Sequence, residues 1–327
     1  MALQTIETPP RVTTREQEDL GTSTKLRLKL RPRNSGQQWY RIVSRVFLYA
    51  ALIAGAVVML FPFFWMVSSS LKTFQEVNLS PPTMLPVNPQ WSNYAEAWGA
   101  PPSGFGRYFF NSLVVAVVGT ALQVFTGITA AYAFARLKFR FSNALFVLVL
   151  ATMMIPFETR IVPNYVLIRQ IPFAGGNDIF GAGGSGLYDT YAGMILPGVA
   201  SAFAVFLLRQ AFMAVPRDYW DALRMDGASH WTFLWRVLIP MTMPAVLTVV
   251  LFGFIGRWNE LLWPLIATQS ESIRPVQLGL MAFSGDEGSL YHLLMAATTL
   301  VAVPGIIFFL FVQRRFVEGL TAFGVKG

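Results

Sequence analysis

The chain has 327 residues, of which 54% are hydrophobic and 13% charged, and its mean hydropathy is +0.50. This composition is too apolar for a soluble domain of that length and predicts a membrane protein. The formal net charge of +8 therefore indicates basic residues on the inner side of a membrane rather than a nucleic-acid-binding surface. The absence of cysteine excludes disulfides, thiolate chemistry and cysteine-ligated metal sites.

Residues 1–40 are polar and basic and lack the apolar period of a helix. Within them, basic residues alternate with leucines from Lys25 to Arg33, a pattern more typical of a juxtamembrane tail than of a strand. We expect a cytoplasmic tail that is disordered or held at the membrane surface. It does not resemble a signal peptide, because the charged region before the first apolar run is far too long.

Six apolar stretches follow, and each predicts a transmembrane helix, since about 20 residues at about 1.5 Å each cross the hydrocarbon of a bilayer. They cover residues 46–67, 109–135, 144–171, 191–208, 237–266 and 293–312. The basic clusters at 25–45, 136–140, 209–236 and 314–315 then lie on one side, with both termini in the cytoplasm and Lys72, Arg107 and Arg274 as exceptions. The prediction is an all-α, six-span domain over 41–318, with residues 319–327 as a C-terminal tail.

Several of these stretches carry details of their own. Small residues in the second, such as Gly119 and Gly127, predict close helix packing. The third is interrupted at Pro156, so either the helix opens there or its charged residues find partners on other helices. In the fifth, Arg257 and Glu260 stand three apart and are predicted to pair on one helix face.

The loop at 217–238 lies between two apolar runs but is too charged to be a span. Residues 217–225 and 229–238 are each predicted to form a short helix, with Asp226-Gly227 as the break, because glycine accepts the positive φ found at helix ends. Its apolar members have no obvious lipid or core to cover, which indicates a docking surface. They are Trp220, Leu223, Trp231, Phe233 and Leu234.

The spacing within this loop resembles the EAA loop of ABC importer membrane subunits, usually written Glu-Ala-Ala-x-x-x-Gly. The matching residues are Asp221, Ala222, Leu223, Asp226, Gly227 and Ala228, with Pro240 twelve positions after Ala228. Asp221 replaces the usual Glu and Leu223 the usual Ala. The resemblance implies a coupling helix pair that sits in a groove of an ATPase subunit and couples its closing to the membrane domain. The alternative is a charged cytoplasmic loop without a partner.

Four further stretches resemble the second of the two permease subunits of maltose-type carbohydrate importers. They are 107–113, 131–136, 258–265 and the final 319–327. The resemblance implies a type I ABC importer permease fold in the inner membrane of a prokaryote. It also implies three partners, a second permease subunit, an ABC ATPase dimer that binds ATP and Mg, and an external solute-binding protein. The C-terminal tail would reach the ATPase dimer, although a frayed end is the other interpretation.

No cofactor or metal site and no catalytic constellation is predicted on this chain. Gly319 and Gly324 have the spacing of a phosphate-binding loop, but Val325 stands where lysine is needed and no strand precedes them. The only histidines, His230 and His292, have no third ligand at a suitable spacing. The chain is therefore expected not to be an enzyme, and its energy source is expected on another chain.

Charged and polar residues at membrane depth are the candidates for a solute path, because they are costly there unless they face a cavity or one another. Together with Arg160, they are Glu158, Asn164, Arg257, Trp258, Asn259 and Glu260. The competing interpretation is that they only lock helices together or lie near the external mouth. Trp258 and Asn259 suit a sugar, since an indole stacks on a sugar ring and an amide bonds its hydroxyls.

The sequence therefore predicts the permease subunit of an ATP-driven carbohydrate importer. One alternative is the same machinery with another solute, such as a glycerophosphodiester or a polyamine, and an anionic solute would need Arg160 or Arg257 unpaired in the cavity. The other is a proton-coupled secondary transporter that uses Glu158 or Glu260 as the proton carrier. The sequence leaves open which solute is carried, whether this chain contacts it, and what the Gly-rich insert at 174–186 does.

Overall fold

The computed structural model describes residues 35–100, 103–283 and 290–324, with side chains from Trp39 to Gln313 apart from Arg41. The described residues form helices and loops and contain no strand, as an all-α fold predicts. Most of the predicted tail at 1–40 and the last three residues lie outside this part of the chain. The chain divides into two compact units, residues 1–62 and 63–327.

The first unit contains most of helix α2, Ser35–Ser70, in which residues 42–70 are long and apolar enough to cross a membrane. The first predicted span is thus helical, and the helix also includes the last residues of the predicted tail. Every side chain described in residues 42–62 is exposed. An apolar helix exposed on all sides is suited to contact with lipid or with another chain.

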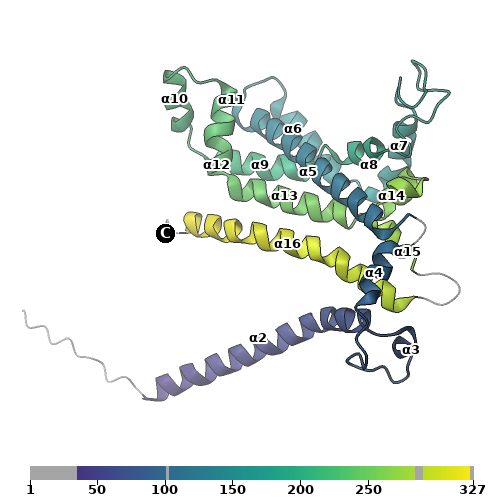
Figure 1. Ribbon diagram of the computed structural model, residues 1–327. Helices are drawn as coiled ribbons and strands as arrows, with labels where there is room; N and C mark the ends of the chain where they lie inside the picture. The colour runs from purple at the N-terminus through teal and green to yellow at the C-terminus, as the bar shows by residue number, and fades with distance from the viewer. Residues whose placement is uncertain (1–34, 101–102, 284–289, 325–327) are drawn as a thin grey trace, which may run out of the picture. The chain divides into compact units, whose positions relative to one another are not determined.

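In the second unit, the long helix α5, Phe105–Arg136, packs against α9, Ala202–Ala214, and α13, Met243–Trp258 (Figure 1). A Cβ atom on Gly127 would lie 3.0 Å from the Cβ of Ala204, so glycine allows α5 and α9 to approach closely. Helix α16, Tyr291–Gly324, packs against α13 and α4, Ser92–Gly99. The small residues of the second predicted span have the packing role expected of them. The predicted C-terminal tail is helical up to Gly324.

Three predicted spans are bent helix pairs rather than single helices. Helix α6, Ser142–Ala151, with η1, Thr152–Met154, meets α7, Phe157–Arg169, at 106°. The pair formed by α8, Tyr191–Ile195, with η2, Leu196–Gly198, and α9 bends by 47°. The third bend, 83°, separates residues 230–241 from α13. Among the described residues, three helices are long enough to span, or up to six if each bent pair counts as one.

The bend after η1 has a local cause in the sequence. Proline disfavours the helical conformation in the residue before it, and Ile155 is extended, with φ −84° and ψ 114°. Pro156 itself has no N–H to continue the helical hydrogen bonds. The interruption predicted at Pro156 is therefore an opening of the helix.

Short elements close the second unit at the end where α5 begins. They are α3, Phe74–Val77; α14, Leu262–Ala267; η4, Glu271–Ile273; and α15, Val276–Met281. On α5, the amide of Asn111 donates to the backbone oxygens of Ser272 and Arg274 and accepts a hydrogen bond from Tyr191. Asn111 thereby holds two connections of this end to α5.

The Gly-rich insert is a folded loop organised by Asn177. The buried Asn177 amide donates to the backbone oxygens of Arg169 and Ile171 and accepts from the N–H of Gly184. A Cβ on Gly184 would lie 2.3 Å from the oxygen of Gly175, so no larger residue fits there without a backbone shift. The glycines thus permit close backbone packing.

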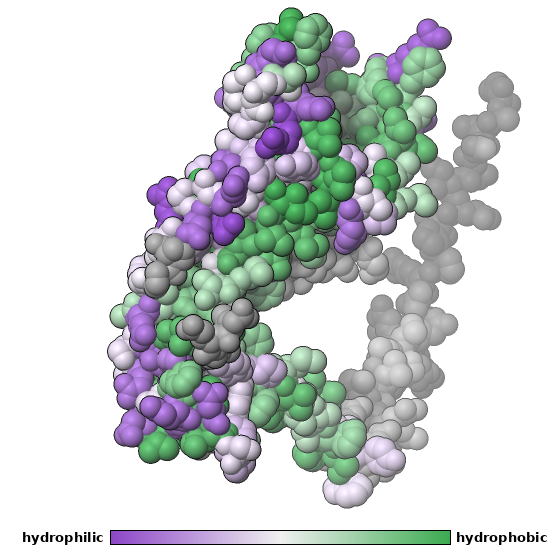
Figure 2. Space-filling model, turned by 90° about the vertical axis from the view of Figure 1, so that its right-hand side faces the viewer, coloured by the Kyte–Doolittle hydropathy of each residue, from purple (hydrophilic) through white to green (hydrophobic). Residues whose placement is uncertain are grey.

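Large apolar side chains are exposed along most helices of the second unit. Figure 2 shows broad continuous areas of apolar residues on the face that it presents. Such areas exceed what a soluble monomer exposes and are expected where lipid or other subunits make contact.

Candidate functional site

The loop between α9 and α13 forms the predicted helix pair. Helix α10, Asp218–Met225, has Asp226 as its C-cap, and Gly227 follows with φ +76°. The N–H of Ala228 bonds the oxygen of Leu223, and the N–H of Gly227 bonds that of Arg224, both at 3.0 Å. These two bonds make a Schellman motif, in which glycine adopts the left-handed conformation at the helix end. The predicted break at Gly227 is confirmed.

The second helix of the pair runs directly into the membrane domain. Helix α11, His230–Phe233, begins with the hydroxyl of Ser229 accepting a hydrogen bond from the N–H of Thr232 at 3.2 Å. It continues as the π-helical η3, Leu234–Leu238, and α12, Ile239–Met241. Residues 230–241 thus form one continuous helical segment, which α13 follows after the bend of 83°.

The residues that carry the loop resemblance are accessible. Asp221, Ala222, Asp226 and Gly227 are exposed, and Leu223 and Ala228 are partly buried. Nothing lies within 4 Å of where a Cβ on Gly227 would be. A partner protein can therefore reach both carboxylates and the turn between the helices.

Most apolar residues of the loop cover a core, which corrects the prediction that they have none. Phe233 and Leu234 are buried in a cluster with residues of α5, α9 and α13, and Trp220 and Leu223 pack against it. Only Trp231 fits the prediction, with 55% of its surface exposed. The reason is that α10 and α11 fold back onto the ends of α5 and α9, a tertiary contact that no local pattern shows.

Two side chains at the end of α5 fix this helix to α9 and to the helix pair. The guanidinium of Arg136 donates to the backbone oxygens of Phe212 and Val215 at the end of α9, both at 2.6 Å, and lies 5.8 Å from the ring centroid of Phe233 on α11. The hydroxyl of Tyr132 lies 2.6 Å from Nδ1 of His230, whose ring stacks on Trp220 at 4.3 Å between centroids. Sequence reasoning considered His230 only as a metal ligand and missed this role. A tyrosine and an arginine in the last turn of a span, facing a charged loop, were the available signal.

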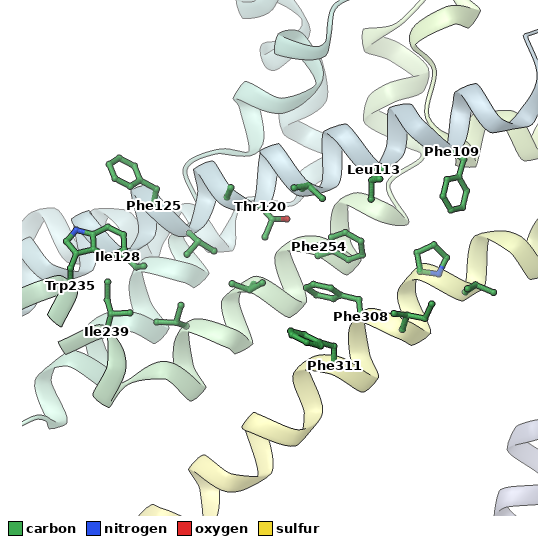
Figure 3. Close-up of a pocket in the computed structure, with 18 residues that line it drawn as sticks. Phe109, Leu113, Thr120, Phe125, Ile128, Trp235, Ile239, Phe254, Phe308 and Phe311 are labelled. Carbon is green, nitrogen blue, oxygen red and sulfur yellow. The ribbon is translucent and has the colours of Figure 1, made fainter. Parts of the chain in front are cut away.

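Two cavities of the second unit differ in chemistry, and the first is apolar. A groove of about 1040 Å³ lies between α5, α13 and α16 and is continued by Trp235 and Ile239 (Figure 3). Thr120 is its one lining residue with a polar side-chain group besides the indole of Trp235. Such a groove offers almost no hydrogen bonds and therefore suits lipid or an apolar helix, not a hydroxylated solute.

The second cavity, of about 470 Å³, is lined where helices are interrupted. The α6–α7 break contributes Thr152, Met153 and Phe157, the α8–α9 break contributes Pro197, Gly198 and residues 200–203, and the end of α13 and the turn after it contribute Gly256, Arg257 and Glu260. Non-helical backbone at membrane depth is tolerated where it is buried in protein or lines a water-filled cavity. Interrupted helices around a polar cavity are typical of solute sites in transporters.

The predicted path residues divide between this cavity and other places. Arg160, Asn164, Arg257 and Glu260 line the cavity, whereas Glu158 and Asn259 are exposed outside its lining. Trp258 is only 2% exposed and packs in the core, with its indole N–H donating to the oxygen of Val301 at 3.1 Å. Its ring is therefore not available to stack on a solute in this cavity.

The predicted pairing of Arg257 with Glu260 on one helix face does not form, because α13 ends at Trp258. The guanidinium of Arg257 instead donates to the side-chain oxygen of Gln123 and, at 2.6 Å, to the backbone oxygen of Gly198. The carboxylate of Glu260 accepts from the N–H of Trp263 at 3.3 Å, at the start of α14. Each residue thus holds a separate helix break in place.

Residues 123–321, more than half of the chain, match the family described as "Binding-protein-dependent transport system inner membrane component". The chain is 33% identical over 288 residues to the arabinooligosaccharides transport system permease protein AraQ of Bacillus subtilis, covering 87% of this chain and 97% of that protein. It is 31% identical over 281 residues to the sn-glycerol-3-phosphate transport system permease protein UgpE of Pectobacterium atrosepticum, with 84% and 95% covered.

The fold is also similar to solved structures. A chain of a bacterial ABC transporter involved in the import of the acidic polysaccharide alginate superposes with a TM-score of 0.71 at 23% identity, covering 86% of this chain and 98% of that one. A chain of the alginate transporter in complex with a pentasaccharide-bound periplasmic protein gives 0.58 at 15% identity, with 84% and 96% covered. With a family match over most of the interrupted spans and relatives that match over almost their whole length, this chain belongs to the binding-protein-dependent transport system inner membrane component family.

Proposed function

We propose that this chain is the permease subunit of an ATP-driven importer that moves a carbohydrate or a closely related polyol across the inner membrane. The observation that carries the proposal is the exposed helix pair at Asp218–Phe233, which is fixed to α5 and covalently continuous with α13. A partner protein that binds this surface outside the membrane can displace the helix pair, and the displacement is transmitted to the spanning helices.

The class of solute is supported by the relatives and by the polar cavity. The two relatives are named for arabinooligosaccharides and for sn-glycerol-3-phosphate, and the similar structure is described for alginate. Each of these solutes carries at least two hydroxyl groups. The cavity offers hydrogen-bonding groups from Arg160, Asn164 and Glu260, which hydroxyl groups need when they leave water.

The proposed machine has further subunits. The helix pair would dock on an ABC ATPase dimer, which holds ATP and Mg, so that Asp221 pairs with a basic group of the ATPase and Gly227 makes the turn between the helices. A second permease subunit would complete the cavity, and an external binding protein would deliver the solute. No catalytic residue is assigned to this chain. Both termini would lie in the cytoplasm, on the side of the helix pair.

The mechanism is alternating access. Closure of the ATPase dimer on ATP would displace α10 and α11, and the continuous path through η3 and α12 would rotate α13. Residues of α13 line the polar cavity, so this rotation would turn the cavity toward the external side. After hydrolysis the helices would return and open the cavity inward.

The test is affinity purification of the chain from its native membrane, followed by mass spectrometry and reconstitution into proteoliposomes. We expect an ABC ATPase and a second permease to stay bound, and uptake to require ATP and the external binding protein. Recovery of the chain alone, active without ATP, would contradict the proposal and favour a proton-coupled transporter instead.

A matched pair of variants tests the role of Asp221 in the same preparation. Asp221→Lys reverses the charge at the predicted ATPase contact and should lower both ATP-driven uptake and ATPase stimulation about tenfold, because like charges across a contact repel. Asp221→Glu should retain both activities. Since Asp221 is exposed, neither change should alter thermal stability appreciably. Full activity of the lysine variant would show that Asp221 does not contact the ATPase.

A further inference from the structure

Two arginines line the polar cavity without a carboxylate partner among the described residues. Arg160, on α7, is exposed, and its recorded contact is with the ring of Phe157 at 5.8 Å. The guanidinium of Arg257 bonds only neutral oxygen atoms, those of Gln123, Gly198 and Gly253. No carboxylate contact recorded among the described residues offsets either guanidinium where it lines the cavity.

The neighbouring residues leave space for the Arg257 side chain and fix its orientation. A Cβ on Gly119 would lie 2.5 Å from its Nε, and one on Gly198 would lie 3.2 Å from its terminal nitrogen. Glycines on α5 and η2 thus leave the space that the guanidinium occupies, and Gln123 orients it. A cation held by neutral dipoles is stabilised without being neutralised, so it remains available to an anion.

One carboxylate, that of Glu260, lines the same cavity, but it accepts the N–H of Trp263 at the start of α14. Two guanidinium groups against one carboxylate leave an excess positive charge around about 470 Å³ of space. Charges interact more strongly in such a partly enclosed site than in water, so this excess discriminates between solutes of different charge.

We propose that the cavity takes an anionic solute, a sugar or polyol that carries a carboxylate or a phosphate group. Arg160 and Arg257 bind the oxyanion, since a guanidinium matches carboxylate and phosphate geometry with paired N–H donors. Asn164 and the carboxylate of Glu260 bind the hydroxyls. This inference rests on the proposed function, because it names the class of solute for the same cavity.

The experiment measures binding to the purified transporter in lipid nanodiscs without its external binding protein, so that the selectivity of that protein does not enter. Saturation-transfer NMR titrations compare two pairs of probes, glycerol 3-phosphate with glycerol and a mannuronate trisaccharide with mannotriose. In at least one pair, the anionic member should bind about tenfold more tightly or better. The pair that shows the preference tells whether phosphate or carboxylate is recognised.

Variants on one helix locate the effect. Arg160→Gln should remove most of the preference, and Arg160→Lys should keep much of it. Arg169→Gln is the matched control, because Arg169 lies on the same helix but outside the cavity lining and contacts the rings of Tyr165 and Tyr188. This control should bind the probes as the wild type does.

Three results would overturn the inference. They are equal binding within both probe pairs, an equal loss in the Arg160→Gln and Arg169→Gln variants, and a failure of Arg160→Gln to assemble with its partners, which would make Arg160 an interface residue. Failure of the proposed function looks different, since no ATPase would then co-purify. The paired probes would still determine the charge selectivity of the cavity in that case.

Discussion

At the scale of single residues, the polar cavity depends on a fit between a glycine and an arginine. Gly119 lies in the middle of α5, where glycine costs about 1 kcal/mol of helix stability relative to alanine. The side chain of Arg257 passes through the space that a side chain at 119 would fill. Gly119 thus lowers the local stability of α5 but leaves room for the guanidinium of Arg257.

This fit predicts that Gly119→Ala destabilises the protein although alanine favours helix. The new methyl group must displace the middle of the Arg257 side chain and weaken its bonds to Gln123 and Gly198, at a cost of about 1–3 kcal/mol for overpacking. The measurement is the melting temperature in detergent, which should fall. Gly305→Ala in α16 is the control, since nothing lies within 4 Å of its Cβ position and its melting temperature should stay or rise. A Gly119→Ala protein as stable as that control would contradict the described position of Arg257.

Residue roles were predictable where the signal is local. The turn at Gly227 follows from spacing and from the φ preference of glycine. The partners of Arg257 were not predictable, because Gln123 and Gly198 are far away in the sequence and a three-residue spacing pointed to Glu260 instead. Likewise, the burial of Trp258 depends on α16 packing against α13.

At the scale of elements, Asp189 holds together two connections, the one before α8 and the one after α14. Its carboxylate accepts hydrogen bonds from the N–H groups of Gln269 and Ser270 and from the hydroxyl of Ser270. Its own N–H donates to the oxygen of Ala267 at 2.9 Å. These hydrogen bonds between Asp189 and residues 267–270, here called the Asp189 clasp, join the start of α8 to the end of α14. Both elements border the polar cavity.

The clasp has a predicted pH dependence. Partial burial opposes ionisation of Asp189, but the hydrogen bonds from Ser270 and Gln269 outweigh it and lower the pKa of the carboxyl below its usual range. A lowered folded-state pKa adds stability that is complete above the unfolded pKa of about 3.9 and is lost as pH falls through the lower folded pKa. The difference in melting temperature between wild type and Asp189→Asn should therefore be constant from pH 7 to about pH 5 and shrink below it. A difference that does not change with pH would show that the charge of Asp189 is not involved.

The elements themselves were partly predictable. Hydropathy located all six apolar stretches, because the need to bury backbone hydrogen bonds in lipid imposes long helices. It did not locate the bend between η2 and α9 or the end of α13 at Trp258, since such breaks are stabilised by tertiary contacts such as those of Arg257. The insert at 174–186 was predicted as a Gly-rich connection, and the role of Asn177 in folding it was not.

At the scale of the whole molecule, the exposed helix pair and the polar cavity are connected through shared helices of the second unit. Helix α5 contributes Tyr132, whose hydroxyl bonds His230 of the pair, and Arg136, which contacts the ring of Phe233, and it contributes Gln123 to the cavity. Helix α13 continues from α12 and carries Arg257 to the cavity. Force applied to the helix pair is therefore expected to reach the cavity through α5 and α13 together.

Substitution of Trp220 tests the connection between the helix pair and the polar cavity most directly. Its indole stacks on His230 and meets the ring of Phe233 at 5.3 Å, so it joins α10 to α11 and to the core beneath them. In Trp220→Ala, the contact between α10 and α11 should loosen, and the free energy of unfolding should fall by about 2–3 kcal/mol. ATP hydrolysis should continue, but with several-fold less uptake per ATP.

Trp231→Ala is the matched control, because it deletes a side chain of the same volume from an exposed position and leaves the core intact. This control should keep its thermal stability, and any loss of function in it should appear as weaker ATPase binding. A Trp220→Ala protein that is destabilised but retains the wild-type ratio of uptake to hydrolysis would mean that motion does not pass through the contact of α10 with the core, leaving α11 and its continuation into α13 as the sole route.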